Sequence, residues 1–148
     1  MPKGPNDPLA YRIFNEIGII DQLASAAFRK VLPPPLNTSM FGVLNHFVRL
    51  GDGKTPSYLA EAFQVTRPSM TSIIERLAAA RLVRVEHSTE DARTKRVWMT
   101  KEGRAARDNA VEATSELLGS IEADLETIDL DRLLEMLVRL RSILDNAR

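Results

Sequence analysis

The side chains best suited to chemistry in this sequence are hydrogen-bonding and basic residues between positions 67 and 76. Apolar residues recur at positions 70, 73, 74 and 77, so a helix here would bury one face and expose the other. The exposed face would carry Arg67, Ser69, Thr71, Ser72 and Arg76. Short hydroxyls and guanidinium groups can read the donors and acceptors of base edges in the major groove of DNA. An ordinary amphipathic helix with a solvated polar face is the alternative.

A second basic group lies between two short stretches in which apolar and polar residues alternate. Such alternation is typical of strands, so this group would form the tip of a β-hairpin. Arg93 on a projecting tip could enter a narrow minor groove, where the negative potential is strongest, and Lys95 follows it closely. Asp91 is unfavourable on a surface that faces DNA, but it could orient Arg93 through a charge-assisted contact. A solvated hairpin without a target is the alternative.

The segment Gly53-Lys54-Thr55 resembles the end of a phosphate-binding loop. The full motif needs a glycine five residues earlier, where this chain has Val48, and no strand precedes the segment. We therefore interpret residues 51–55 as a turn that ends a helix. Lys54 could lie near a DNA phosphate.

The sequence offers little support for a metal site or for nucleophilic catalysis. His46 and His87 are the only histidines and the chain has no cysteine, so they form a poor transition-metal set, although one completed by carboxylates is not excluded. His46 falls on a helix and fits a packed histidine better than a ligand. No nucleophile is paired with a base, so we expect no enzyme, no metal and no cofactor.

The charge of the chain is zero overall but unevenly distributed. Residues 1–50 carry a net charge of +2, residues 51–107 carry +4 and residues 108–148 carry −6. A basic middle with an acidic C-terminal segment is a pattern that nucleic-acid-binding proteins use. Taken alone, this asymmetry fits solvated faces of different charge equally well.

The elements that would position the two basic groups follow one another directly. A short helix, a tight turn and a second helix capped by Thr66 form the helix-turn-helix layout, in which the second helix reads DNA. Pro68 is tolerated because it falls in the first turn of that helix. The expected elements are helices over 57–63 and 67–80, a turn over 64–66, and strands over 83–87 and 96–99.

Longer helices are expected on either side. Asp7 and Pro8 would open the first as cap and first helical residue, and the prolines at 33–35 would stop it. The second would be capped within residues 37–39 and end at 51–53. Thr100 would cap a fifth helix whose apolar stripe reaches residue 125, and Asp129 would cap a sixth.

The whole pattern predicts a mainly α protein with a small β-hairpin wing, in a single domain over residues 1–148. The winged helix-turn-helix would occupy residues 37–100. The helices over 7–33 and 101–148 carry aliphatic stripes that a chain of 148 residues would struggle to cover by itself. We therefore expect these helices to form the interface of a homodimer.

The winged region resembles the MarR family of bacterial transcription regulators. The resemblance covers about residues 57–103, and the flanking helices agree in order and length but in no specific motif. It is carried by Leu59-Ala60 with Val65–Ser69, by Ile73–Leu77 with Arg81–Val83, and by Asp91–Arg93 with Val97, Met99-Thr100 and Gly103.

This resemblance implies a homodimer whose N- and C-terminal helices interleave at the interface. Such a dimer would bind a pseudo-palindromic duplex with half-sites about one helical turn apart, roughly 34 Å. It also implies a transcription regulator, often a repressor, that is released from DNA by a small, frequently aromatic, effector. A protein-interaction module of the same fold that does not bind DNA is the alternative.

Two residues and one absence depart from the family pattern. Ser72 stands where similar proteins often carry a larger or basic residue. Trp98 would lie on the strand face opposite Val97 and Met99, where it could cover the wing or touch a ligand or partner. Because there is no cysteine, regulation by thiol oxidation is excluded.

The sequence also bears on where the protein works. No apolar run approaches the roughly 18 residues of a membrane span, and the Pro- and Gly-rich N-terminus lacks a signal-peptide core. We therefore expect a cytoplasmic protein.

Overall fold

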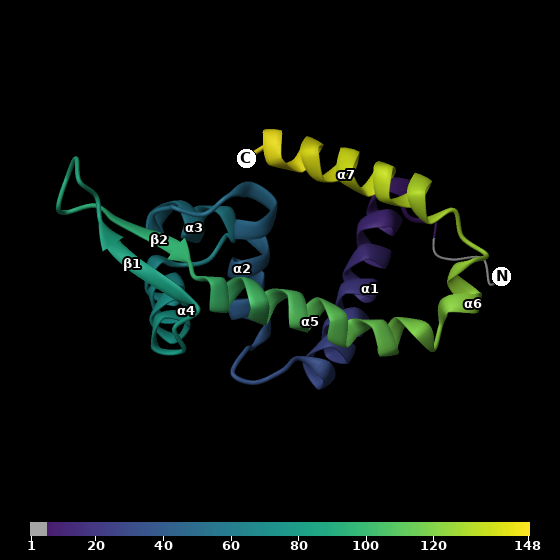
Figure 1. Cartoon of the computed structure of the whole chain (residues 1–148). Helices are drawn as coiled ribbons and strands as arrows, with labels where there is room; N and C mark the ends of the chain where they lie inside the picture. Colours follow the sequence, from purple (N-terminus) through teal and green to yellow (C-terminus); the bar gives the residue numbers. More distant parts are fainter. Residues whose placement is uncertain (1–5) are drawn as a thin grey trace. The chain divides into compact units, whose positions relative to one another are not determined.

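The computed structural model describes residues 6–148 and shows a mainly α protein with one two-stranded antiparallel sheet (Figure 1). Residues 1–5, the segment on which the expected lack of a signal peptide partly rests, lie outside the described residues. The predicted fold class is confirmed. The chain divides into two compact units, Met1–Thr114 and Ser115–Arg148, and the boundary falls within one helix. None of the helices over residues 6–148 combines the length and apolarity needed to cross a membrane.

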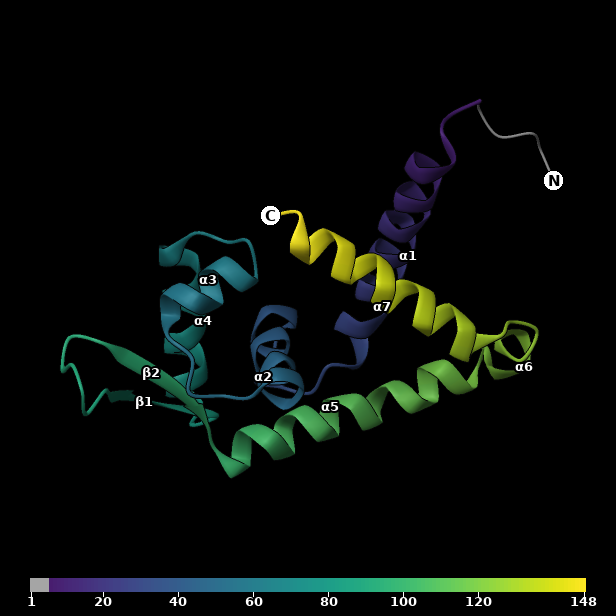
Figure 2. The same ribbon diagram turned by 90° about the horizontal axis from the view of Figure 1, so that it is seen from above.

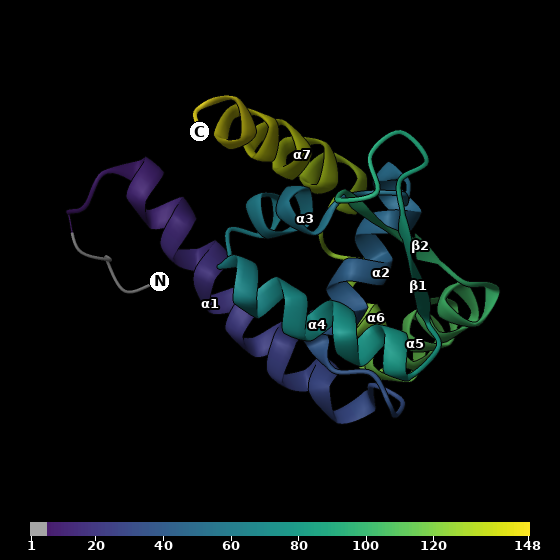
Figure 3. The same ribbon diagram turned by 90° about the vertical axis from the view of Figure 1, so that its left-hand side faces the viewer.

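The elements of the first unit follow the predicted order. They are α1 (Leu9–Val31), α2 (Thr38–Leu50), α3 (Pro56–Ala62), α4 (Arg67–Ala79), β1 (Val83–His87), β2 (Lys95–Met99) and the start of α5 (Lys101–Gly119). Figure 3 turns α4 and the hairpin toward the viewer, where they lie side by side. Helix boundaries agree with the predictions to within a few residues, except at the two places described next.

Two predicted features of the terminal helices are wrong. Asp7 does not cap α1, because the cap position is Pro8, which has no side chain that could accept a hydrogen bond. The fifth helix does not continue to residue 125, because α5 ends at Gly119 and a separate turn, α6 (Glu122–Leu125), follows. Figure 2 shows the bend between α5 and α6. The apolar stripe continues across this break, so periodicity alone could not locate it.

The hydrophobic core lies among α2, α3, α4 and the base of the hairpin. Its largest fully enclosed side chains are Val43, Leu44, Leu59, Met70, Leu77 and Val97. In α2, Met40, Val43, Leu44 and Phe47 are buried, whereas Phe41 and Val48 are only partly covered. The face of α2 that enters the core is therefore centred on Val43, Leu44 and Phe47.

Polar contacts bind the surrounding elements to this core. Asn37 caps α2 by accepting from the backbone N–H of Met40 at 2.9 Å. The guanidinium of Arg107 on α5 donates from Nε and Nη2 to Oδ1 of Asn45 on α2, at 3.2 and 3.0 Å. Thr100 accepts from the N–H of Gly103 and so caps α5, as predicted. The caps fix where α2 and α5 begin, and the bonds of Arg107 join α5 to α2.

The second unit consists of the end of α5, α6 and α7 (Leu130–Asn146). Asp129 caps α7 by accepting from the N–H of Arg132 at 3.0 Å, as predicted. Within residues 130–146 no side chain is buried, although leucines recur along the helix at positions 130, 133, 137, 140 and 144. Alternating spacings of three and four residues are typical of a helix whose apolar seam packs against another helix.

Candidate nucleic-acid interface

The start of α4 is held by a reciprocal contact between Thr66 and Ser69. Thr66 Oγ1 accepts from the backbone N–H of Ser69 at 3.2 Å, which confirms Thr66 as the cap. The same hydroxyl lies 2.8 Å from Ser69 Oγ and donates to it. Ser69 Oγ therefore has its own proton left to donate to an acceptor outside the protein.

The predicted reading face of α4 is mostly exposed. Arg67, Ser69, Thr71 and Arg76 are exposed, whereas Ser72 is half-buried. The opposite face is anchored in the core by Met70, Ile74 and Leu77. The helix therefore presents its polar side chains from a rigid base, but the short hydroxyl of Ser72 lies deeper than the others.

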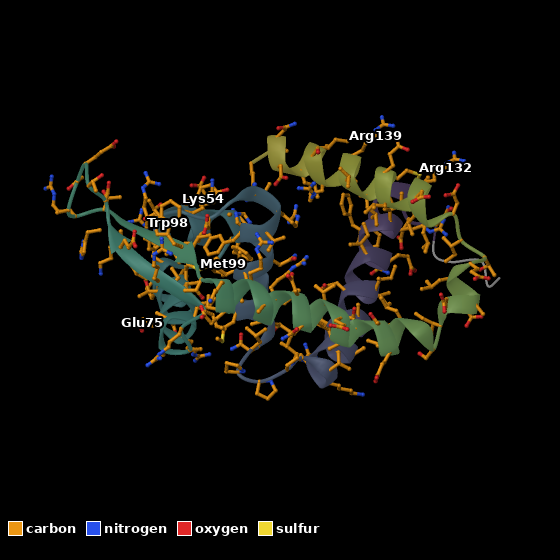
Figure 4. All side chains as sticks on the ribbon, in the orientation of Figure 1. Lys54, Glu75, Trp98, Met99, Arg132 and Arg139 are labelled. Atoms are coloured by element: carbon orange, nitrogen blue, oxygen red, sulfur yellow. The ribbon has the colours of Figure 1, made fainter. Side chains whose placement is uncertain are left out.

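Glu75 is a residue of this face that the sequence reasoning missed. Its side chain is exposed on α4 and is labelled in Figure 4. On a helix, positions 72, 75, 76 and 79 lie on one side, so Glu75 shares the surface with Ser72 and Arg76. The helical spacing in the sequence could have identified Glu75 as part of this face. A carboxylate here repels phosphates and can accept from the exocyclic amine of cytosine, so it favours selectivity over affinity.

The hairpin projects from the core with a regular register. Val83 pairs with Met99, Val85 with Val97, and His87 with Lys95. In β1 and β2 the buried side chains are Val83 and Val97. The base of the hairpin is therefore packed, and its outer half is exposed.

The tip of the wing is shaped by short polar contacts. Asp91 Oδ1 accepts from the backbone N–H of Arg93 at 3.0 Å and lies 3.4 Å from its Nε. His87 contacts the carbonyl of Ala92 through Nδ1 at 2.6 Å. The side chain of Arg93 remains 93% exposed. Asp91 thus holds the backbone of the turn, while the guanidinium of Arg93 extends into solvent.

The loop between α2 and α3 is bound to β2 along most of its length. The N–H of Gly53 donates to the carbonyl of Val97 at 2.8 Å, and the N–H of Val97 donates to the carbonyl of Lys54 at 2.9 Å. Asp52 Oδ2 accepts from the N–H of Met99 at 3.0 Å. Arg96 Nη1 donates to the carbonyl of Gly53 at 2.8 Å. The sequence pattern predicts only a turn here, because contacts across more than 40 residues leave no local signal.

Trp98 covers this loop. A Cβ added to Gly53 would lie 2.6 Å from the indole ring, and the guanidinium carbon of Arg84 lies 5.8 Å from the ring centroid. Trp98 is half-buried as a result. Of the two roles considered for it, covering the wing surface is the one the geometry favours.

The other basic candidates lie between the wing and α3. Lys54 Nζ lies 5.1 Å from the ring centroid of Tyr58, a cation–π distance. Arg93 and Lys95 line a hollow of about 320 Å³ whose other wall is residues 55–57 at the start of α3. The structure therefore brings two of the predicted basic residues beside the helix-turn-helix.

His46 is buried in the winged helix-turn-helix among aromatic side chains. Its Nε2 lies 3.4 Å from the hydroxyl of Tyr58, and its ring packs against those of Tyr58 and Phe63. Burial lowers the pKa of His46 from the ordinary value of 6.5, and the charges of Arg49 and Lys54 lower it further. Within residues 6–148 no group of three or more His, Cys, Asp or Glu side chains could hold a metal ion.

The second unit contains a hollow of about 600 Å³ between the end of α5 and the start of α7. Leucine and isoleucine side chains line it together with Glu122, Glu126 and Asp131. Three carboxylates disfavour an anionic ligand. We assign no ligand to this hollow.

Comparison with known proteins places these elements in a family. Residues 35–94 match the model of the MarR family. No curated protein matches the chain. Among solved structures, the transcriptional regulator BldR from Sulfolobus solfataricus is 25% identical, with 90% of this chain and 94% of BldR covered and a TM-score of 0.71.

Two further structures share the fold at lower identity. CouR from Rhodococcus jostii RHA1, bound to p-coumaroyl-CoA, is 22% identical with a TM-score of 0.72, covering 93% of this chain and 95% of CouR. BpsR from Bordetella bronchiseptica, whose DNA binding is regulated by 6-hydroxynicotinic acid, is 22% identical with a TM-score of 0.69, covering 96% and 99%. The family match over residues 35–94 shows that the helix-turn-helix and the first part of the wing form a winged helix region of the MarR family, and the fold over most of the chain is that of MarR-family transcriptional regulators.

Proposed function

We propose that this protein binds pseudo-palindromic duplex DNA as a homodimer and represses transcription until a small aromatic effector releases it. The observation that carries the proposal is the pairing of an exposed polar face on α4 with a projecting arginine on the wing beside it. A helix of this kind fits the major groove, and an exposed arginine fits the adjacent minor groove. Such a regulator would work in the cytoplasm, with the chromosome.

The proposed DNA contacts divide into base-reading and backbone-binding residues. Ser69, Thr71, Ser72 and Arg76 would read base edges from α4, with Arg67 at the edge of the groove. Arg93 would enter the minor groove from a backbone that Asp91 orients. Lys95 and Lys54 would neutralise phosphates. The DNA-binding region would be residues 37–100.

The terminal helices support the homodimer. Within residues 9–31 no side chain of α1 is buried, and Leu9, Ile20 and Leu23 are 68%, 60% and 69% exposed. In α7, Leu134 and Ile143 are 61% and 63% exposed. Apolar surface of this extent is rare on monomeric proteins and marks an interaction site. We therefore propose that residues 1–148 form a single domain. The helices within residues 7–33 and 101–148 would form its interface with a second copy of the chain.

The effector class is proposed from two relatives. CouR is bound to p-coumaroyl-CoA, and the DNA binding of BpsR is regulated by 6-hydroxynicotinic acid. Both compounds combine an aromatic ring with an acidic group or thioester. We propose an aromatic acid or its thioester as effector of this chain.

Selection of bound sequences from a pool of random duplexes tests the proposal. We expect enrichment of a pseudo-palindrome with half-sites about 10 base pairs apart. Binding of the selected duplex should weaken steeply with salt, because each neutralised phosphate contributes a slope of about −0.9 in log K against log salt. Arg93→Ala should weaken binding, whereas the matched control Arg139→Ala should not, because helical spacing puts the exposed Arg139 on the side of α7 opposite its leucine seam. Addition of 6-hydroxynicotinic acid or p-coumaroyl-CoA should release the duplex.

Failure to enrich any sequence, together with no salt-sensitive shift, would overturn DNA binding. Sedimentation of the protein with and without duplex separates the remaining possibilities. A dimer that never co-sediments with DNA would favour the interaction module of the same fold, and a monomer that binds DNA would overturn only the homodimer.

A further inference from the structure

The wing is packed at its base only. In β1 and β2 the buried side chains are Val83 and Val97, while residues 84–87, 95 and 96 are exposed. A two-stranded hairpin without an apolar face is at best marginally ordered in water. The direction in which the wing projects must therefore depend on specific contacts near its base.

Arg96 makes one such contact. Its Nη1 donates to the carbonyl of Gly53, across 43 positions of sequence, at 2.8 Å. Gly53 is buried, and its N–H is already bonded to Val97 of the same strand. Buried carbonyls need a partner, and the guanidinium of Arg96 supplies it from the first exposed position beyond Val97.

Trp98 packs on the same strand face as Arg96, two residues along, and closes over the same glycine. Any Cβ at Gly53 would meet the indole ring at 2.6 Å, and the φ of +71° at Gly53 is itself unfavourable for other residues. Figure 4 shows Trp98 and Lys54 gathered where the loop meets β2. Arg96, Trp98 and Gly53 thus form a brace between the wing and the helix-turn-helix.

We propose that Arg96 is a positioning residue for DNA binding: its bond to Gly53 aims the wing so that Arg93 reaches the duplex, and its guanidinium does not itself bind DNA. The inference rests on the DNA binding proposed above. Lys95, its neighbour, is the matched control, because it carries the same charge on the opposite strand face and contributes nothing to the brace.

The first test needs no DNA. Trp98 is the only tryptophan of the chain, so its fluorescence reports on the brace alone. We expect Arg96→Met to shift the emission to longer wavelength and to increase quenching by acrylamide. Lys95→Met should leave both unchanged. Helical circular dichroism verifies that each variant is folded, and Arg96→Lys, which keeps a donor of similar reach, should restore much of the wild-type signal.

The second test is a double-mutant cycle on the duplex recovered from the random pool. We expect Arg96→Met to weaken binding about tenfold in the wild-type background and to have little effect when Arg93 is already alanine, because residues that act as a unit are not additive. Lys95→Met should cost the same in both backgrounds. A merely structural destabilisation would not show this dependence on Arg93.

Each other outcome overturns the proposal. Weaker binding with unchanged Trp98 fluorescence would make Arg96 a direct DNA contact. Altered fluorescence with unchanged affinity would make the brace irrelevant to DNA binding, and additivity with Arg93→Ala would mean that Arg96 does not act through the wing tip. If the wild-type protein binds no duplex, the proposed function fails, whereas the fluorescence still reports whether Arg96 holds the wing.

Discussion

The winged helix and the terminal helices are both rich in aliphatic residues but use them differently. In the winged helix, Leu44, Leu59 and Leu77 are completely enclosed by their own chain. In α1 and α7, regularly spaced leucines and isoleucines remain exposed along residues 9–31 and 130–146. An apolar stripe therefore predicts that a helix will bury a face, but not whether the surface that covers it belongs to the same chain.

The largest expected effect comes from the same leucine-to-alanine change made in the winged helix and in a terminal helix. Leu77→Ala should lower the free energy of unfolding by about 2–5 kcal/mol, because it opens a cavity in an enclosed core. The cost should not depend on protein concentration. Leu134→Ala, the same change at an exposed site, should act on dimer dissociation instead. Chemical denaturation at several concentrations, with sedimentation equilibrium, measures both, and equal, concentration-independent losses would remove the distinction.

A pair of glycines sharpens the comparison. A Cβ at Gly103 would collide with the carbonyl oxygen of Leu82, so Gly103→Ala should destabilise the winged helix by about 1–3 kcal/mol. A Cβ added at Gly18 in α1 would meet nothing within 4 Å. Gly18→Ala should stabilise the helix by about 0.5–1 kcal/mol, since alanine loses less backbone entropy. Thermal melts of both variants test this, and a loss of stability in Gly18→Ala would reveal close packing against α1.

Protonation of His46 should lower the stability of the winged helix and leave the terminal helices unaffected. Its pKa is lowered in the folded state from 6.5, so as pH falls below about 6.5 the unfolded chain takes up a proton before the folded chain does. The free energy of unfolding should therefore decrease with falling pH, by at most about 1.4 kcal/mol per pH unit, and level off below the folded pKa. Well above a pH of about 6.5 this dependence should vanish. Denaturation of wild type and His46→Phe across this range isolates it, and identical pH profiles would contradict the assignment.

The smallest effect is expected at the wing tip. Asp91→Ala removes an exposed ion pair, and such pairs contribute about 0–1 kcal/mol to stability. The unfolding free energy should hardly change. Binding of the selected duplex should weaken because Arg93 loses the partner that shapes its turn. Unchanged affinity would mean that the guanidinium of Arg93 finds its position without Asp91.

Local patterns predicted most of the elements of this protein. The caps at Thr66, Thr100 and Asp129 were identified correctly because a cap depends on residues within one turn of the helix. The assignment of Asp7 was wrong because Asp7 and Pro8 both suit a helix start, and sequence does not decide which one occupies the cap. The end of α5 was missed because the apolar periodicity continues through Gly119 into α6.

The candidate site was predicted less completely than the fold. The exposed positions of Arg67, Thr71 and Arg76 follow from helical spacing, and the same spacing would also have included Glu75. The contacts of Asp52, Gly53 and Arg96 could not be foreseen, because they join a loop to a strand more than 40 residues later. In the sequence alone, nothing distinguishes Arg96 from the other basic residues of the hairpin.

The sequence by itself determined most of the helices and strands, apart from the break between α5 and α6, and most of the polar side chains that α4 and the wing tip expose, because these properties depend on neighbours within a few residues. The tertiary structure alone decided that Arg96 bonds to Gly53, that Trp98 closes over the same residue, and that the core is completed by α2, α3, α4 and the hairpin base while the apolar faces of α1 and α7 stay exposed. Those outcomes depend on which distant segments pack together, and packing is a property of the whole fold.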